Sequence, residues 1–285
     1  MRFPVTFLLL LAIGSFQFHL GCQEPEEIGG CVFPSDLEAY ELVWSDEFDG
    51  PEIDGSKWSF NLGDGCEIDL CGWGNNELQY YTDRPANVAI SSSGRLVIKA
   101  LKESPLYLGQ YAYTSARMVT KNKGDWKFGR IDVRARLPKG QGLWPAIWML
   151  PTDNAYGSWP TSGEIDIMEL VGNQPNKVLG TIHFGHDYHR FVSAEYYLPE
   201  GDFSQDFHDF TVLWSEDCIQ FLVDGIAYGE PNTRSTTLPT TWPFDQPFHL
   251  LLNIAIGGNL PGNPDASTVF PQVMEVDYVR VYQEK

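Results

Sequence analysis

Three acidic residues lie close together in an apolar segment of this sequence. The segment TSGEIDIMEL contains Glu164, Asp166 and Glu169 among isoleucine, methionine and leucine residues. Burying neighbouring carboxylates is costly unless they serve a purpose, and each carboxylate raises the pKa of the others. Two such groups can act together, one as a nucleophile and the other as a proton donor with a raised pKa. The pattern therefore favours hydrolysis of a glycosidic bond.

The spacing of the acids predicts a β-bulge. In a regular strand Glu164 and Asp166 share a face, whereas Glu169 would point to the opposite face. One extra residue at Ile167–Met168 would return Glu169 to the first face, and bulges are frequent next to active sites. We therefore expect the three carboxylates to line one groove, with the outer two about 5–7 Å apart, near the separation of a retaining glycosidase.

On this hypothesis each acid has a separate role. Glu164 is the nucleophile, and Glu169 is first the general acid and then the general base. Asp166 shares a proton or a hydrogen bond with Glu164 and holds it in position. Two alternatives for the same triplet are a solvent-exposed acidic strand and a Ca²⁺ site.

The composition indicates a neutral ligand with flat surfaces. The chain of 285 residues has 19 Lys and Arg against 38 Asp and Glu, which gives a formal net charge of −19. Such a surface repels a polyphosphate, so nucleic acid is disfavoured as a partner. Aromatic residues make up 14% of the chain, with 9 Trp and 13 Tyr, more than a core alone requires. Sugar rings are one class of partner that stacks on such side chains.

The elements that must position these side chains are β-strands. In residues 129–138, Ile131, Val133 and Ala135 alternate with charged residues, which predicts a half-buried antiparallel strand. Scattered glycine and proline residues interrupt the windows that could have formed long helices. Further strands are predicted at residues 95–102, 210–217, 218–225, 247–256 and 274–282.

These strands predict a single all-β domain. Between Leu42 and Tyr282 the sequence has no linker, repeat or low-complexity tract. So many strands in one domain favour a β-sandwich with a large, curved sheet, and the curved sheet would form a concave groove.

The N-terminus predicts export. Residues 1–21 contain one Arg and an apolar run that is too short to span a bilayer, as in a signal peptide. Cleavage before Cys22 would resemble a bacterial lipoprotein site with a lipid on Cys22, although His19 departs from the usual apolar residue. Plain secretion and an uncleaved anchor are the alternatives. Residues 22–36 would then form a tether, and residues 37–285 the catalytic domain, with membrane contact only through the lipid.

The remaining cysteines are consistent with an oxidising compartment. Cys66 and Cys71 enclose four residues of a Gly-rich loop, which predicts a local disulfide. A metal site is the alternative, but the sequence lacks a matching His/Cys set. Whether Cys31 and Cys218 pair is left open.

The acidic segment resembles the active-site strand of glycoside hydrolase family 16 in its E-x-D-x-x-E form. The flanking sequence is similar to the laminarinase-like branch of endo-β-1,3-glucanases in that family over nearly the whole domain. The similar segments are, in order, WSDEFDG (44–50), GWGNNELQYYT (72–82), GLWPAIWMLP (142–151), WPTSGEIDIMEL (159–170), TIHFG (181–185), LNIAIGGNLPGNP (252–264) and VDYVRVYQ (276–283).

This resemblance implies a fold and a function. The fold would be a jelly-roll β-sandwich of the concanavalin A type with a concave substrate groove. The reaction would be retaining endo-hydrolysis of β-1,3-glucosidic bonds in laminarin-type glucans, with mixed-linkage β-1,3-1,4-glucans as further substrates. No cofactor is implied for catalysis, and we expect a monomer.

The resemblance also implies residue roles, which agree with those argued above for the three acids. The tryptophans that would form sugar platforms are Trp144, Trp148 and Trp159. The polar residues that would bind sugar on the non-reducing side of the cleaved bond are Asn75, Glu77 and Arg117, and His183 would lie beyond that bond. A structural ion pair is the alternative for Arg117, and a satisfied core histidine is the alternative for His183.

Members of the family often carry a structural Ca²⁺ on the convex face. The resemblance would take its ligands from Glu47, the backbone of Gly94, and Asp277. Oxygen ligands of this kind suit Ca²⁺. Such an ion would stiffen the fold and take no part in catalysis.

Two other functions remain open. An agarase, porphyranase or carrageenase of the same family would share the bulged motif, although the GWGNNELQYYT segment and the negative charge favour a neutral glucan. A non-catalytic β-glucan-binding protein of the same fold is the second alternative, and the three intact acids argue against it. The sequence does not separate hydrolysis from transglycosylation.

Overall fold

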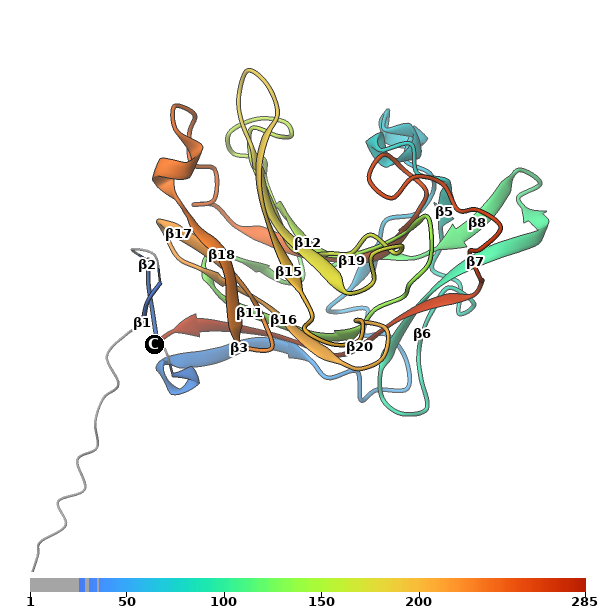
Figure 1. Ribbon diagram of the computed structural model, residues 1–285, viewed down its shortest axis with the longest axis horizontal. Coiled ribbons are helices and arrows are strands. Elements are labelled where there is room, and N and C mark those ends of the chain that lie inside the picture. Colours follow the sequence, from blue (N-terminus) through green and yellow to red (C-terminus); the bar gives the residue numbers. More distant parts are fainter. Residues whose placement is uncertain (1–25, 29–30, 35) are drawn as a thin grey trace, which may run out of the picture.

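The computed structural model describes residues 26–28, 31–34 and 36–285 (Figure 1). Within these ranges the regular structure consists of β-strands and four short 3-10 helices. The helices are η1 (Leu37–Ala39), η2 (Cys66–Ile68), η3 (Cys71–Gly74) and η4 (Arg234–Thr237).

The predicted signal peptide and Cys22 lie outside the described residues. Over the part of the chain that the structure describes, no helix has the length and apolar character needed to cross a membrane.

One of the two main sheets carries the acidic segment. It has eight strands, and β10 joins it by pairing with β19. In spatial order its strands are β15 (Arg190–Tyr197), β14 (Lys177–Phe184), β13 (Glu164–Glu169), β12 (Leu143–Pro151), β19 (Phe248–Ile256), β9 (Arg117–Val119) and β4 (Ser59–Phe60), with β10 at Asp125–Trp126.

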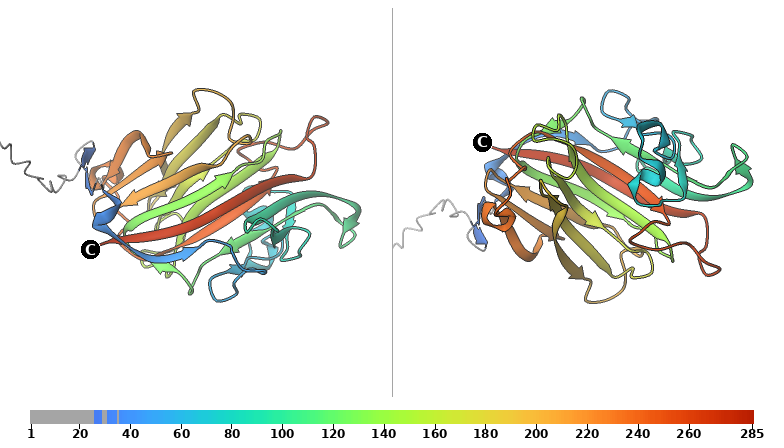
Figure 2. Two further views of the ribbon diagram at one scale, coloured as in Figure 1. Left: turned by 90° about the horizontal axis from the view of Figure 1, so that it is seen from below. Right: turned by 90° about the horizontal axis from the view of Figure 1, so that it is seen from above.

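The other main sheet has ten strands and lies behind the first. Figure 2 shows the two sheets from opposite sides, with β20 (red) and β3 (blue) in front in the left view. Its strands are β18 (Ile226–Thr233), β17 (Cys218–Val223), β16 (His208–Trp214), β11 (Gly129–Arg136), β20 (Gln272–Glu284), β7 (Leu96–Tyr107), β8 (Tyr111–Ser115) and β5 (Gln79–Tyr81), with β3 (Tyr40–Asp46) beside β20 and β6 (Val88–Ile90) beside β7.

The sequence pattern therefore gave the correct fold class. Every segment predicted as a strand forms one, and the two facing sheets are the jelly-roll β-sandwich that the resemblance implied. In β11 the side chains of Ile131, Val133 and Ala135 are fully buried, as their alternation predicts. They pack against apolar side chains of the first sheet, such as Ile147 and Ile182, in one continuous core.

Loops flank the face of the first sheet that points away from the core. In Figure 1 the loop with η2 and η3 (cyan) and the loop after β19 (red) rise on one side of β12 and β19. The loops that precede β13 and β15 (yellow) rise on the other side. Any long ligand on this face must therefore run across the strands, between the two groups of loops.

Part of the predicted tether is packed on the domain. β1 (Glu26–Ile28) and β2 (Cys31–Phe33) form an antiparallel hairpin, and a disulfide joins Cys31 to Cys218 at the start of β17. The Cys31 and Phe33 side chains are buried against residues of the second sheet, including Leu213. The tether boundary at residue 36 was therefore placed too far along the chain. A disulfide and a buried aromatic ring hold residues 31–33, and an acidic, aperiodic sequence gives no sign of either contact.

We predict that this disulfide contributes strongly to stability. Cys31 and Cys218 are 187 positions apart, so their bond restricts the unfolded chain far more than the Cys66–Cys71 bond, which spans 5 positions. Replacing Cys31 and Cys218 by serine should lower the free energy of unfolding by about 2–5 kcal/mol. Denaturant titration measures the change, and the matched Cys66→Ser/Cys71→Ser variant should lose less. An equal loss in the two variants would contradict the prediction.

Candidate active site

The bulge predicted in β13 is present. Ala146, Ile147 and Trp148 of β12 pair with Glu169, Met168 and Asp166, so Ile167 is the extra residue. Ile165, Ile167 and Met168 all point into the core. Because two successive side chains of the bulge turn inward, Glu169 returns to the outer face that Glu164 and Asp166 occupy.

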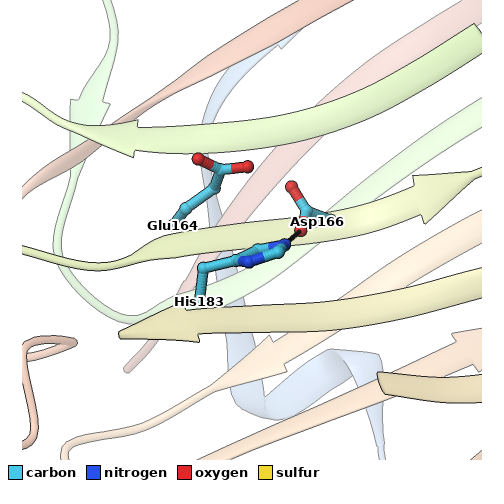
Figure 3. Close-up of side chains that lie close together, drawn as sticks. All are labelled: Glu164, Asp166 and His183. Atoms are coloured by element: carbon cyan, nitrogen blue, oxygen red, sulfur yellow. Dashed lines mark ion pairs between the residues drawn. The ribbon is translucent and has the colours of Figure 1, made fainter. Parts of the chain in front are cut away.

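The carboxylates of Glu164 and Asp166 form a tight cluster with His183. One ligand-type atom from each of the three residues lies within 4.8 Å of the other two (Figure 3). His183 stands opposite Glu164 on β14, and its Nε2 lies 3.0 Å from Oδ2 of Asp166. Its Nδ1 lies 2.7 Å from Nε2 of His189. His183 is therefore not a core histidine, since it joins the acidic cluster to an exposed loop.

Two of the predicted sugar-platform tryptophans bind the outer carboxylates. Trp159 donates its indole N–H to Oε2 of Glu164 at 2.7 Å, and Trp144 donates to Oε1 of Glu169 at 2.9 Å. Trp159 is 51% exposed. A hydrogen bond from a fixed N–H orients a carboxylate and favours its charged form. The indoles of Trp159 and Trp144 thus position Glu164 and Glu169.

The cluster carries less charge than three free carboxylates would. Burial, together with the neighbouring charge of Asp166, raises the pKa of Glu164 to about 8. Burial is also the main cause that raises the pKa of Glu169 to about 7 and the pKa of Asp166 well above its ordinary value. At neutral pH the three groups therefore share protons, and Asp166 is well placed to keep one because it is the most deeply buried.

A hydrogen-bonded chain extends from β12 to the loop before β5. Trp148 donates to Asn253 at 2.7 Å, and Asn253 donates to the hydroxyl of Tyr81 at 3.0 Å. Tyr81 in turn donates to Glu77 at 3.3 Å, and Gln79 donates to the same carboxylate oxygen at 2.6 Å. Burial raises the pKa of Glu77. Asn75 donates its side-chain amide to the other oxygen of Glu77 at 3.5 Å, so two of the three polar residues predicted on the non-reducing side belong to this network.

Two backbone contacts hold the segment of Asn75 and Glu77 against the loop that follows β19. The backbone N–H of Asn259 donates to the carbonyl of Asn75, and Glu77 pairs with Gly257 in an isolated bridge. Gly258 has a φ of +105°, and a Cβ there would lie 3.1 Å from the Asn75 carbonyl and 3.4 Å from the Trp144 ring. Glycine is required because the loop after β19 must pass between these groups.

Arg117 lies between two indole rings. Its guanidinium carbon is 4.3 Å from the ring centre of Trp73 and 4.7 Å from that of Trp148. The side chain is only 8% exposed, and burial lowers its pKa. Among the described residues no carboxylate lies within ion-pair distance of Arg117, so the ion-pair alternative is wrong. Stacking on Trp73 and Trp148 fixes the guanidinium beside the carboxylate cluster.

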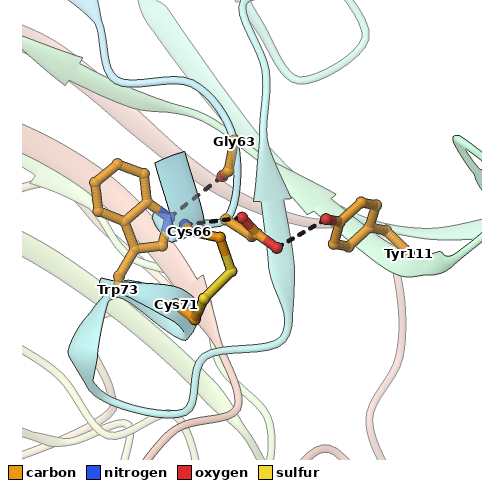
Figure 4. The surroundings of a disulfide bond; sticks show 6 residues. Gly63, Cys66, Cys71, Trp73 and Tyr111 are labelled. Carbon is orange, nitrogen blue, oxygen red and sulfur yellow. Dashed lines mark hydrogen bonds between the residues drawn. A yellow bond between two sulfur atoms is a disulfide. The ribbon is translucent and has the colours of Figure 1, made fainter. Parts of the chain in front are cut away.

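The predicted Cys66–Cys71 disulfide is present in the loop that supplies Trp73 (Figure 4). Asp64 accepts hydrogen bonds from the backbone of Cys66 and from the hydroxyl of Tyr111, at 3.0 and 2.7 Å. The indole N–H of Trp73 donates to the carbonyl of Gly63 at 3.3 Å. The disulfide therefore helps to hold one of the two rings that enclose Arg117.

Four residues of the site were missed by the sequence analysis: Trp73, Tyr81, Asn253 and His189. The first three lie inside segments that resemble the family, so the resemblance contained a signal that was not used. His189 lies in a polar loop, and only the fold shows its contact with His183.

The residues predicted to bind Ca²⁺ also meet in space. Glu47, Gly94 and Asp277 line one cavity of about 420 Å³ on the second sheet, together with Asp49. Arg280 donates to both carboxylate oxygens of Glu47, at 2.9 and 2.8 Å, and Arg95 donates to Asp277 at 3.1 Å. The oxygen donors suit Ca²⁺, although arginine partners already balance two of the carboxylates.

Comparison with known proteins places the chain among carbohydrate-active relatives. The model of "Glycosyl hydrolases family 16" matches residues 71–280. A beta-glucanase of Rhodothermus marinus is 45% identical over 258 residues, which cover 86% of this chain and 85% of that protein. A glucan endo-1,3-beta-glucosidase A1 of Niallia circulans is 44% identical over 92% of this chain, which spans only 40% of the length of that relative.

A solved structure shows the same likeness in three dimensions. The catalytic domain of an endo-1,3-beta-glucanase (laminarinase) from Thermotoga petrophila superposes with a TM-score of 0.80. Its sequence is 47% identical, and the match covers 86% of this chain and 98% of the other.

We predict that the acidic cluster destabilises the fold as the pH rises. Glu164 has an ordinary pKa of 4.5 when unfolded and about 8 when folded, so the protonated group contributes stability below pH 4.5 that is lost as the pH rises to 8. Glu164→Gln removes this effect. At pH 8 the variant should melt about 2–4 °C or more above the wild type, the shift that ~1 kcal/mol gives in a domain of this size, and the advantage should shrink towards pH 4.5.

Thermal denaturation followed by circular dichroism measures this difference across the pH range. The control is Glu230→Gln, which replaces an exposed glutamate of β18 and should show no such trend. A melting difference between Glu164→Gln and the wild type that is the same at every pH would refute the prediction.

Proposed function

This chain belongs to glycosyl hydrolases family 16, and from that membership we propose that it hydrolyses β-1,3-glucosidic bonds inside laminarin-type glucans with retention of configuration. The observation that carries the proposal is the position of Glu164 and Glu169 on one face of β13, each held by an indole N–H. The names of the glucan-acting relatives support the choice of substrate.

In the first step Glu164 attacks the sugar. A carboxylate oxygen of Glu164 forms a bond to the anomeric carbon while the bond from that carbon to the glycosidic oxygen breaks. The leaving oxygen takes a proton from Glu169. This step needs a charge on Glu164 and a proton on Glu169. The pKa values of about 8 for Glu164 and about 7 for Glu169 favour the reverse distribution in the empty site, so the reactive state is a minor form of the pair.

In the second step water releases the sugar. Glu169, now a carboxylate, takes a proton from a water molecule that attacks the anomeric carbon, and the bond from that carbon to Glu164 breaks. Asp166 lies between the two glutamates along β13 and contacts His183. A proton kept on Asp166 limits the negative charge beside Glu164 while the charge moves between substrate and protein.

The surroundings of the cluster favour a neutral polysaccharide. The acidic side chains Glu77, Glu164, Asp166 and Glu169 line the path, whereas Arg117 is enclosed by two indoles. A sulfated galactan would bring its anionic groups against these acids. Reducing-sugar release from laminarin, lichenan, curdlan, agarose and carrageenan tests the proposed substrate. Activity restricted to agarose or carrageenan would overturn the choice of a glucan, and activity on carrageenan alone would also overturn the charge argument.

We predict that Glu164→Ala lowers kcat on laminarin by at least ~10³-fold while binding of the polysaccharide stays measurable, because the variant keeps the groove and loses the nucleophile. Reducing-sugar release measures the rate, and affinity electrophoresis measures binding. Azide should partly restore turnover of Glu164→Ala and give the α-glycosyl azide, because azide then attacks in place of the carboxylate. Glu169→Ala should give the β-product instead. The control is Glu230→Ala, and an active Glu164→Ala enzyme would exclude the assignment.

We propose that the protein is exported, with a lipid on Cys22. The disulfides Cys31–Cys218 and Cys66–Cys71 support an oxidising compartment. Mass spectrometry of protein from the membrane fraction tests the lipid, and an unmodified soluble chain would reject anchoring.

We also propose a structural Ca²⁺ in the cavity lined by Glu47, Gly94 and Asp277. An ion that binds only the folded state stabilises it, by about 2.7 kcal/mol at a concentration of 100 Kd. Ca²⁺ should therefore raise Tm after treatment with a chelator, whereas kcat should not change. Asp277→Asn should remove the response. The same Tm with Ca²⁺ and with the chelator in the wild type would reject the site.

A further inference from the structure

We propose that the edge strand β15 provides an acceptor-side sugar platform, with the ring of Phe191 as its outermost surface. The inference rests on the proposed function, because it extends the groove for the same glucan. The occupant would be the second glucosyl unit beyond the cleaved bond.

The register of the sheet places Phe191 in line with the nucleophile. Glu164 on β13 pairs with His183 on β14, and His183 pairs with Phe191 on β15. Directly paired residues point to the same face of a sheet, and neighbouring strands are about 4.8 Å apart. Phe191 therefore lies on the catalytic face, two strand spacings or about 10 Å from Glu164, on the side opposite Arg117.

Aromatic rings connect these two positions without a break. The ring of Trp159 lies 4.7 Å from that of His189, and the His183 and His189 rings are stacked at 4.9 Å. Phe191 follows, at 5.8 Å from His189 and 5.9 Å from His183. Since Trp159 also donates to Glu164, the row of rings begins at the reacting group.

The outer end of this row is open to solvent. Phe191 is 61% exposed and Trp159 is 51% exposed, so each residue leaves more than half of its surface open to solvent. An exposed aromatic group that continues a polar groove is typical of a binding surface. Ser193 stands on the next row of the same face and is exposed, so its hydroxyl is placed to bind a sugar hydroxyl, and it is held by a hydrogen bond of 2.9 Å with the buried Thr181.

The chemistry of this surface fits a sugar ring. The axial C–H face of β-glucose stacks on a flat ring, and hydroxyl groups at its rim form hydrogen bonds with neighbouring side chains. A second copy of the chain that pairs along the free edge of β15 is the other occupant to be considered. The kinetic experiment separates these two cases.

The test compares two substrates and four proteins. Laminarihexaose places glucosyl units on both sides of the cleaved bond, whereas an aryl β-laminaribioside places only its aryl group on the acceptor side. The variants are Phe191→Ala, Phe191→Trp and the control Tyr197→Ala. Tyr197 is also on β15 and is 54% exposed, but it lies six residues from Phe191, about 20 Å along the strand.

The expected result is a selective loss. Phe191→Ala should lower kcat/KM on laminarihexaose about five- to ten-fold more than on the aryl glycoside, the size of one lost stacking contact. Phe191→Trp should keep most of the wild-type value, and Tyr197→Ala should match the wild type on both substrates. The labelled hexaose should also be cut at a different position by Phe191→Ala, because fewer units are held beyond the bond.

Three outcomes would contradict the platform. If Phe191→Ala lowered kcat/KM equally on both substrates, Phe191 would support the folded site and would not contact the acceptor sugar. No loss on either substrate would exclude a sugar contact. A change in molecular mass by light scattering with unchanged kinetics would assign the ring to contact between copies. Failure of the wild type on both substrates would instead refute the proposed function, so the two failures are distinguishable.

Discussion

The β-bulge at Ile167 is the constraint on which the active face depends. Two successive side chains, Ile167 and Met168, point into the core, and their burial holds the distorted strand in place. Only because of that distortion can Glu169 share a face with Glu164 and Asp166. The apolar half of β13 thus determines the geometry of its acidic half, so core packing and catalytic spacing are two results of one backbone irregularity.

Bringing three carboxylates together has an electrostatic cost, and the surrounding elements limit it. Trp159 and Trp144 donate to the outer two acids, and His183 contacts the inner one. The two indole donors come from the loop before β13 and from β12, and His183 comes from β14, so all three side chains lie on neighbours of β13 in the sequence or in the sheet. The raised pKa values show that compensation is incomplete. Because the pKa values of Glu164 and Glu169 stay raised, these groups can lose and regain a proton near neutral pH.

The two sides of the cluster are built differently. On the side of β19 and β9, Arg117 is fixed between two indoles, one of which belongs to a disulfide-bonded loop. On the side of β14 and β15, the rings of Trp159 and Phe191 are exposed, and β15 is the last strand of the sheet. A rigid, hydrogen-bonded site on one side and an open aromatic edge on the other suit a polymer that must be held firmly at the bond and can extend beyond it.

The sequence by itself determined what depends on neighbouring residues. Strand alternation has a period of two, so it revealed the strands, the displaced Glu169 and the need for a bulge. The short spacing of Cys66 and Cys71 within one loop indicated their disulfide, because both cysteines are close together in the chain. The tertiary structure decided the contacts between distant positions. These include the Cys31–Cys218 disulfide, the indole donors to the glutamates, the contact of His183 with Asp166 and the stacking of Arg117. Such contacts depend on which strands become neighbours and in which register they pair, and no local pattern in the chain records that choice.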